Sequence, residues 1–336
     1  MKKKKILIIG GAGFIGHNLA LKLKKLKYSV TIVDSLQINN ILWLKKNKDQ
    51  LPFPNLSMSI LKERFKLLKK NNIPLIKIDV RNYQKLSQVF RKTKPQIVIH
   101  LAAVSHANKS NKDPFSTFDH SFRTLENSLD NSKNKNFNVK QFIFLSSSMV
   151  YGNFKKNIVK EDDHCSPLGI YAALKLSGEN IIKVYNQVFG LPYTIIRPSA
   201  LYGERCISRR VGQIFIENIL NKKEIIIQGD GKEKLDFTYI DDLVNGIICA
   251  VKSKKSLNET FNLTYGEAQS INKLIHFLRK NFEDVKVKYI KRDKLMPKRG
   301  TLSTAKAKRL INYKAKWPLY KGYQKYINWY KEFYNK

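Results

Sequence analysis

Short apolar runs separated by amphipathic stretches recur through the first half of the chain. The first run, Lys5–Ile9, is almost continuously apolar, which is typical of a strand buried on both faces of a sheet. A helix pattern follows it to about Leu26, and a second run covers Ser29–Val33. Further runs of this kind cover Leu75–Ile78, Ile97–Leu101, Gln141–Ser146 and Tyr193–Ile196. Strands that alternate with helices in this way predict an α/β fold built on a doubly wound parallel sheet.

Two regions depart from this alternation. Residues 39–72 indicate a helical insertion after the second strand, a surface feature to which we assign no chemistry. Beyond Arg197 the alternation loosens, and short strands are predicted only at 225–228 and 260–262. Near the C-terminus an aromatic stripe at helical spacing is typical of core packing, and its residues are Tyr323, Ile327, Tyr330 and Tyr334.

The charge balance of the 336 residues is strongly basic, since 63 Lys and Arg face 26 Asp and Glu, which gives +37. An excess of this size can indicate a protein that binds nucleic acid or a membrane surface. The lysines are spread along the whole chain, however, and we interpret them as solvated surface positions rather than a specific nucleic-acid site. The resulting field would still attract an anionic ligand.

The sequence also argues against export and against a membrane anchor. Lysines precede the N-terminal apolar run as in a signal peptide, but glycines break the run and no A-x-A cleavage site follows. No stretch of about 18 apolar residues is present, so no spanning helix is predicted. Three widely spaced cysteines without CxxC spacing predict neither a disulfide framework nor a metal site, and are typical of the cytoplasm; they are Cys165, Cys206 and Cys249.

The strongest local signal is the glycine-rich turn that leaves the first strand and opens the first helix. In this GxxGxxG pattern Gly10 permits a tight turn, Gly13 lets backbone approach a pyrophosphate, and Gly16 lets helix and strand pack closely. The start of the helix at Phe14 and Ile15 then offers free N–H groups to phosphates. The pattern predicts a dinucleotide site.

Asp34 stands at the end of the second strand, about 20 residues after the glycine turn, where a carboxylate can accept a hydrogen bond from the adenosine ribose 2′-hydroxyl. A carboxylate there would repel a 2′-phosphate. The expected cofactor is therefore NAD rather than NADP.

Tyr171 and Lys175 lie at i and i+4, so they project from the same helix face. We expect the Lys175 ammonium to lower the pKa of the Tyr171 phenol, since a nearby positive charge favours the ionised form. A serine-rich strand end, which includes Ser147, precedes this pair by some twenty residues. The Tyr and Lys pair gains its value as a candidate site from this serine-rich strand end.

Taken in order, these motifs resemble the extended short-chain dehydrogenase/reductase family, in its nucleotide-sugar epimerase and dehydratase branch. The resemblance covers nearly the whole chain and includes GGAGFIG, Asp34, Asp79-Val80, HLAA at 100–103, SSSMVYG at 146–152, YAALK at 171–175, Arg197-Pro198 with Tyr202-Gly203, and the Gly and Asp pattern at 229–242. It implies a Rossmann domain of residues 1–196 plus about 236–262. A smaller substrate-binding domain would take residues 197–235 plus about 263–336.

The resemblance also implies roles for individual residues. Asp79 and Val80 would hold the adenine, while Leu101, Ala102 and Ala103 would line the cofactor. Ser147 would hydrogen-bond the reacting hydroxyl while Tyr171 takes its proton, and Lys175 would also bind the nicotinamide ribose. The predicted substrate contacts are Ser148, Arg210 and Arg299, with Arg205 and Arg209 competing for the phosphate.

Ser148 and Met149 follow the catalytic serine at positions where dehydratases of this branch usually have an Asp-Glu pair. Because Met149 cannot transfer a proton, dehydration is disfavoured, and Asp34 argues against an NADPH-dependent reductase. The predicted function is NAD-dependent epimerisation of a nucleotide-activated sugar, most often at C4, by a cytoplasmic homodimer. A dehydratase, a dehydrogenase or reductase, and a non-catalytic protein with a basic surface remain alternatives.

Other positions depart from the pattern of many epimerases. Ala200 and Leu235 stand where an Asn and an Arg commonly touch the diphosphate, and Ser121 replaces a frequent Asn near the nicotinamide. Lys232, Lys234 or Arg210 could supply the missing charge. His106, beside the cofactor loop, could contact the sugar or serve only as a structural residue.

Overall fold

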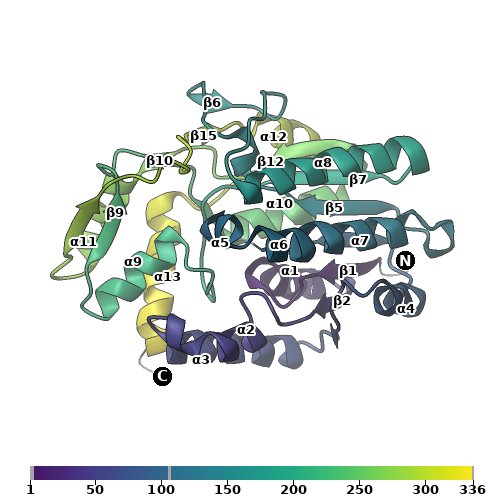
Figure 1. The fold of residues 1–336 in the computed structure, drawn as a ribbon, viewed down its shortest axis with the longest axis horizontal. Coiled ribbons are helices and arrows are strands. Elements are labelled where there is room, and N and C mark those ends of the chain that lie inside the picture. The colour runs from purple at the N-terminus through teal and green to yellow at the C-terminus, as the bar shows by residue number, and fades with distance from the viewer. Residues whose placement is uncertain (1–3, 105–106, 335–336) are drawn as a thin grey trace.

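A computed structural model of the protein describes residues 4–104 and 107–334 (Figure 1). Its centre is a seven-stranded sheet in the order β12-β7-β5-β4-β1-β2-β3, in which all neighbouring strands are parallel. The strands are β1 Lys5–Ile9, β2 Ser29–Asp34, β3 Leu75–Lys77, β4 Ile97–His100, β5 Gln141–Leu145, β7 Tyr193–Arg197 and β12 Glu259–Asn262. The predicted α/β fold with a doubly wound parallel sheet is confirmed.

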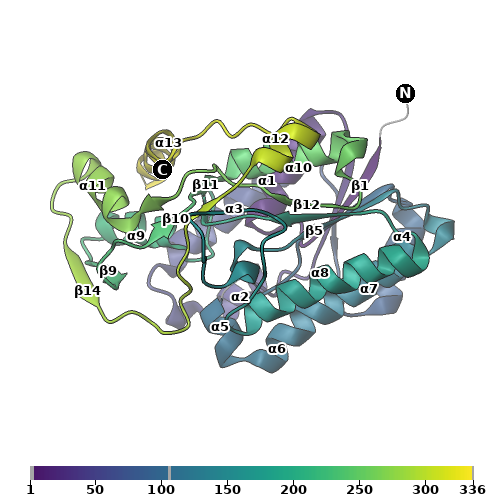
Figure 2. The same ribbon diagram turned by 90° about the horizontal axis from the view of Figure 1, so that it is seen from above.

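The central strands are largely apolar because both faces of the sheet are covered there. On β1, Ile6 and Ile8 enter one hydrophobic cluster, whereas Leu7 and Ile9 enter a second cluster on the opposite face. The first face is covered by α1 Phe14–Lys25 and α10 Ile240–Lys252, and the second by α4 Tyr83–Thr93, α7 Thr124–Lys133 and α8 Ile170–Phe189 (Figure 2). The carboxyl ends of these strands carry the site described below.

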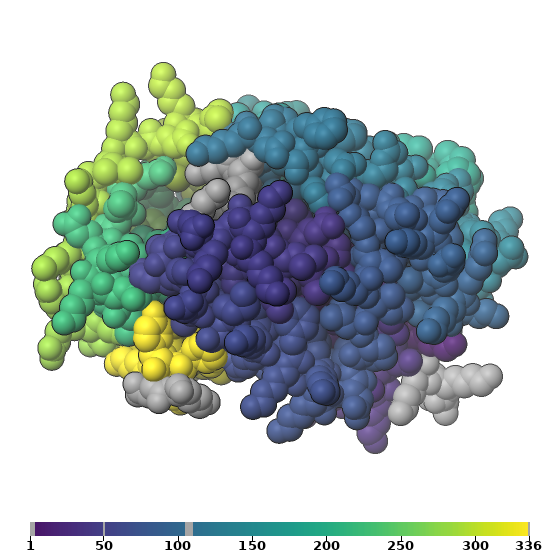
Figure 3. All heavy atoms as spheres, turned by 60° about the horizontal axis from the view of Figure 1, so that its bottom comes forward, coloured from purple at the N-terminus to yellow at the C-terminus, as the bar shows by residue number. Residues whose placement is uncertain are grey.

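Residues 39–72 form the predicted helical insertion, with α2 Ile41–Lys46, a 3₁₀ turn at Lys48–Gln50 and α3 Pro54–Lys70. The insertion packs against α13 Leu319–Tyr334, since Leu44, Ile60 and Leu61 share a cluster with Trp329 and Phe333. Figure 3 shows the insertion beside the yellow C-terminal helix. It therefore joins the N-terminal and C-terminal parts of the chain.

The rest of the C-terminal half is built from short strand pairs and helices. The pairs are parallel β8 Leu201–Tyr202 with β11 Thr238–Tyr239, β9 Ile225–Gln228 with β14 Val287–Ile290 and β6 Ile158–Val159 with β15 Thr301–Leu302, and antiparallel β10 Lys234–Leu235 with β13 Gln269–Ser270. The helices are α9 Val211–Leu220, α11 Ile271–Asn281 and α12 Ala305–Ile311, with a 3₁₀ turn at Lys254–Ser256. Because α12 packs on β12 and α10, the second predicted domain is in close contact with the first, and the exact division stays a prediction.

The aromatic stripe near the C-terminus is core, as predicted, at three of its four positions. Tyr323, Ile327 and Tyr330 are fully buried on α13, whereas Tyr334, in the last turn, is 40 % exposed. Within the described ranges no helix combines the length and apolarity needed to cross a bilayer.

The segment between β4 and β5 holds the remaining helices. They are α5 Ala107–Lys112, α6 Pro114–Phe118, a single π-helical turn at Asp119–Arg123, and a 3₁₀ turn at Lys135–Phe137 after α7. A further 3₁₀ turn, Ser148–Tyr151, follows β5. π-helical turns often mark functional sites, and this one presents His120 to the cavity described next.

Candidate active site

The glycine turn between β1 and α1 has the backbone geometry that the sequence predicts. Gly10 has φ +79°, and a Cβ there would lie 2.8 Å from the backbone N of Ala102. A Cβ on Gly16 would lie 2.6 Å from Cα of Gly11, so the helix packs directly against its own turn. Gly13 is the N-cap residue of α1 and provides no side-chain cap, which leaves the first N–H groups of the helix available to an anion.

Asp34, the last residue of β2, fixes this turn in place. Its two carboxylate oxygens accept hydrogen bonds from the backbone N of Ala12 at 3.0 Å and of Leu36 at 2.8 Å. Burial raises the pKa of Asp34, and these two hydrogen bonds oppose that rise. Each oxygen keeps a lone pair that could accept a ribose hydroxyl.

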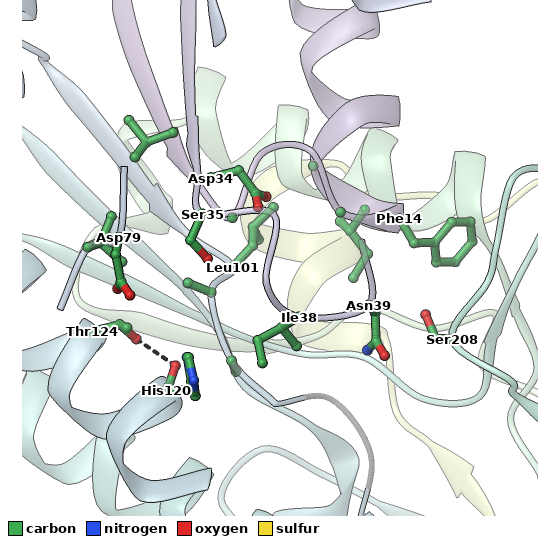
Figure 4. A pocket seen from close by; sticks show the side chains of 18 of the residues that line it. Phe14, Asp34, Ser35, Ile38, Asn39, Asp79, Leu101, His120, Thr124 and Ser208 are labelled. Carbon is green, nitrogen blue, oxygen red and sulfur yellow. Dashed lines mark hydrogen bonds between the residues drawn. The ribbon is translucent and has the colours of Figure 1, made fainter. Parts of the chain in front are cut away.

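A large open cavity extends from the glycine turn across the carboxyl ends of β1, β2 and β4. It holds about 900 Å³ of empty space, part of which is open solvent, and eleven of the predicted cofactor residues line it: Gly10, Gly13, Phe14, Ile15, Gly16, Asp34, Asp79, Val80, Leu101, Ala102 and Ala103. Figure 4 shows Asp34 and Leu101 near its centre, with His120 and Thr124 on one side and Phe14 and Ser208 on the other. Ligands of doubly wound sheets bind at this edge.

Several lining residues were not predicted. They are Val33, Ser35, Ile38, Asn39, Arg64, His120, Thr124 and Ser208. Ser35–Asn39 directly follow Asp34 in the chain, and that adjacency is a signal that could have found them. His120 and Thr124, by contrast, reach the cavity through the π-helical turn and the start of α7, which the sequence pattern does not indicate.

Asp79 lies at the cavity wall but is already engaged. Arg81 donates to it from Nη2 at 2.6 Å, and also donates to Asp119 at 2.5 Å. Burial acts to raise the pKa of Asp79, but the hydrogen bonds from Arg81 outweigh it and the pKa is lowered. The carboxylate is therefore ionised and held in position beside Val80.

The three predicted catalytic side chains meet at the end of β5. Ser147 lies close enough to Tyr171 for its hydroxyl to act to lower the pKa of the phenol. Lys175 donates to the carbonyl of Leu145, the last residue of β5, at 2.6 Å, and so ties α8 to the strand that leads into Ser147. Tyr171 and Lys175 also line a second, smaller cavity together with Ser121, Leu125, Phe144 and Leu174.

The electrostatics of this group differ from the sequence expectation. Burial raises the pKa of Tyr171, and the groups that oppose this are Arg210 and Ser147 rather than Lys175. Lys175 is itself buried, and burial lowers its pKa to about 7, although Glu179 acts in the opposite direction. The expectation that Lys175 lowers the phenol pKa is thus wrong for this arrangement, because loss of hydration dominates at both groups.

The structure separates the competing arginines. Arg205 donates to His17 Nε2 at 3.1 Å and to Asn18 at 3.0 Å, and Arg209 is 3.4 Å from Glu217. Both are therefore committed to structural contacts. Arg210 has no ion pair among the described residues and lines the large cavity. Its positive charge acts to lower the pKa of both Tyr171 and Arg299.

Arg299 lies in a cluster of positive charge. Burial lowers its pKa to about 10, with Arg210 and Arg292 acting in the same direction, and its Nε has no hydrogen-bond partner. Arg292 is paired with Glu233, whereas no ion pair of Arg299 occurs in residues 4–104 and 107–334. Arg210 and Arg299 together form an uncompensated cationic pair.

The other predicted positions have mixed outcomes. Ser148 is only 1 % exposed, and Ser147, Ser148 and Arg299 line neither of the two cavities. Lys232 is 83 % exposed beside Asp230, so it does not replace the missing arginine at Leu235. His106 lies outside the described residues.

No cluster of three or more His, Cys, Asp or Glu side chains that could hold a metal ion occurs in the described part of the chain. Cys165, Cys206 and Cys249 are free thiols. The candidate site thus consists of the large open cavity together with the hydroxyl, amine and guanidinium groups described above.

Comparison with known proteins agrees with this arrangement. The model of the NAD dependent epimerase/dehydratase family matches residues 6–264. Protein CapI of Staphylococcus aureus is 31 % identical, with 99 % of this chain and 100 % of that protein covered, and the UDP-glucuronate 4-epimerase of Thermodesulfobacterium geofontis is 30 % identical, with 97 % and 96 % covered. The crystal structure of a Bacillus cereus UDP-glucuronic acid 4-epimerase with UDP-glucuronic acid and NAD superposes with a TM-score of 0.85, at 28 % identity and 98 % and 99 % coverage.

Proposed function

Because the chain belongs to the NAD-dependent epimerase/dehydratase family, we propose that it epimerises a UDP-linked sugar at C4 through a transient keto sugar. The observation that carries the proposal is the gathering of Ser147, Tyr171 and Lys175 at the end of β5, with Met149 two residues after Ser147. The relatives named for 4-epimerisation of UDP-sugars support the choice of nucleotide and of carbon. The proposed enzyme is a cytoplasmic homodimer.

NAD, when bound, supplies reversible hydride transfer at the sugar carbon. Tyr171 accepts the proton of the sugar hydroxyl, and Ser147 holds that hydroxyl by a hydrogen bond. Lys175, fixed to the carbonyl of Leu145, positions the nicotinamide ribose. Once the keto sugar has turned its opposite face toward the cofactor, Tyr171 would return the proton to the sugar oxygen, which would complete the epimer.

The cationic pair of Arg210 and Arg299 suits a diphosphate. A dianion between them would compensate both positive charges and accept hydrogen bonds from the free Nε of each side chain. The positive charge of Arg210 also acts to lower the pKa of Tyr171. It therefore links diphosphate binding to the reacting end of the sugar.

The alternative reactions differ in what they require beyond Tyr171. A dehydratase needs an additional acid and base, and the buried hydroxyl of Ser148 and the thioether of Met149 are poor substitutes. One relative, a dTDP-glucose 4,6-dehydratase of Dictyostelium discoideum, is nevertheless 30 % identical over 77 % of this chain. Dehydration is therefore the second candidate.

The test is incubation of the purified protein with UDP-glucose, UDP-glucuronate and UDP-N-acetylglucosamine, followed by chromatographic separation of the epimers. We expect one epimer pair to interconvert without net formation of NADH. A 4-keto-6-deoxy product would establish dehydration, and stoichiometric NADH would establish a dehydrogenase.

Tyr171→Phe is the decisive variant. Loss of the proton acceptor should lower kcat by ~10²–10⁴-fold while NAD stays bound. Tyr185→Phe, on the same helix but outside both cavities, is the matched control and should keep full activity. Equal activity of Tyr171→Phe and wild type would contradict the proposed chemistry.

A further inference from the structure

Helix α3 of the insertion carries one charged residue in its buried stripe. Its buried positions are Ser57, Ile60, Leu61, Arg64 and Leu68, which recur at helical spacing toward the interior. Arg64 is 1 % exposed, although arginine is almost never fully buried without an ionic partner. The insertion thus delivers a guanidinium to a place where packing alone would favour an apolar side chain.

Two of the three nitrogens of Arg64 have a partner. Nε donates to the carbonyl of Arg205 at 2.9 Å, and Nη2 donates to the same oxygen. Nη1 is buried and has no hydrogen-bond partner. No carboxylate of the described residues lies within ion-pair distance of Arg64. Asp34 is the carboxylate that acts on the pKa of Arg64, but both of its oxygens accept hydrogen bonds from backbone N–H groups.

Arg64 consequently has no salt-bridge partner among the described residues. Burial lowers its pKa to about 10, and Arg205 acts in the same direction, while Cys206 and Asp34 act against that shift. Leaving a buried cation without a counter-ion is costly, and an anionic ligand would remove that cost. The position of Arg64 indicates which anion that is.

Arg64 lines the large cavity together with Gly13, Phe14 and Ile15 at the uncapped start of α1. It also acts electrostatically on His17, in the next turn of that helix. The first turn of α1 offers N–H donors and a positive dipole, and Arg64 adds a full positive charge to the same region. This combination fits a pyrophosphate.

We propose that Arg64 binds the pyrophosphate of NAD, with Nη1 as the donor, and that the insertion 39–72 is therefore part of the cofactor site. Nε and Nη2 hold the guanidinium to the carbonyl of Arg205, in the loop that leads to Ser208 and Arg210. Arg64 would thereby contact both the cofactor and the loop that carries Arg205, Ser208 and Arg210. The inference rests on NAD binding alone and not on the identity of the sugar.

The experiment measures binding by calorimetry to nucleotide-free protein, with adenosine, ADP, NAD and NADP as probes. In Arg64→Met we expect affinity for ADP and NAD to fall about 10–100-fold, as for loss of a charge-assisted hydrogen bond, and affinity for adenosine to stay unchanged. Arg64→Lys keeps the charge and should lie between Arg64→Met and wild type. It also serves as the test if the methionine variant does not fold.

Glu63→Gln is the matched control, because Glu63 is the neighbouring residue on α3 and faces Arg205 at 3.7 Å. It disturbs the same attachment between helix and loop while leaving Arg64 in place, and should bind every probe as wild type does. Equal losses for adenosine and ADP would overturn the proposal, since Arg64 would then only shape the cavity. Tight NADP binding that depends on Arg64 would also overturn it, because the contact would then be to a 2′-phosphate. Either result leaves the proposed epimerase reaction to be judged by its own assay.

Discussion

Replacement of Asp34 by alanine separates two roles that the structure gives to one carboxylate. Asp34 accepts backbone hydrogen bonds from Ala12 in the glycine turn and from Leu36 after β2. The same carboxylate lines the cavity where an adenosine ribose is expected. The variant should therefore affect both stability and cofactor choice.

The stability effect follows from two donors that lose their acceptor. Each unsatisfied buried donor costs about 1–3 kcal/mol, and because the cavity can admit water to both, we expect the lower end, about 2 kcal/mol in total. In a chain of this size that corresponds to a fall of a few degrees in Tm. Asp34→Asn keeps one acceptor oxygen and should lose about half as much.

The cofactor effect is larger. A ribose hydroxyl bonded to a carboxylate is worth about 1.5–3 kcal/mol, so the Kd for NAD should rise about 10–100-fold. NADP should bind at least about tenfold better than to wild type, because unit like charges at about 4 Å repel by about 4 kcal/mol near a protein surface. The preference for NAD over NADP should thus shrink at least about 100-fold.

Calorimetric titration of nucleotide-free protein with NAD and NADP, paired with thermal melting, measures both effects. Unchanged NAD affinity in a folded Asp34→Ala protein would refute the ribose assignment. Equal weakening of NAD and NADP would show that Asp34 only supports the turn.

Two further predictions concern buried cations. Because burial lowers the pKa of Lys175 to about 7, the unfolded chain binds more protons than the folded chain between about pH 7 and 10.5. The free energy of unfolding should therefore rise with pH in that window, by up to about 1.4 kcal/mol per pH unit. Thermal melting of the cofactor-free protein should show this rise, and Lys175→Met should flatten it. Arg299→Gln should raise KM for the sugar nucleotide about 10–100-fold and leave NAD affinity unchanged. The control Arg309→Gln, at an exposed position, should change neither quantity. Steady-state kinetics that show a fall in kcat alone would contradict a diphosphate contact of Arg299.

The sequence alone was sufficient for the sheet and for the turn at its centre. The central strands of the sheet appear in the sequence as apolar runs because they are covered on both faces, and β1 begins and ends where its run does. The glycine turn could also be predicted from sequence, because φ +79° at Gly10 and the close backbone approach at Gly16 both require glycine. Signals of this kind are local, so each can be recognised within a few residues.

What the tertiary structure decided concerns groups that are far apart in the chain. Arg64 reaches the cofactor cavity only because α3 packs beneath the loop of Arg205, 141 residues away, and nothing in the helical pattern of the insertion indicates that contact. Likewise, only folding commits Arg205 and Arg209 to structural partners and leaves Arg210 free for a ligand. The sequence specifies which side chains can carry charge, but packing sets their hydration and their counter-ions. For this reason the pKa of Tyr171 departs from the expectation based on spacing.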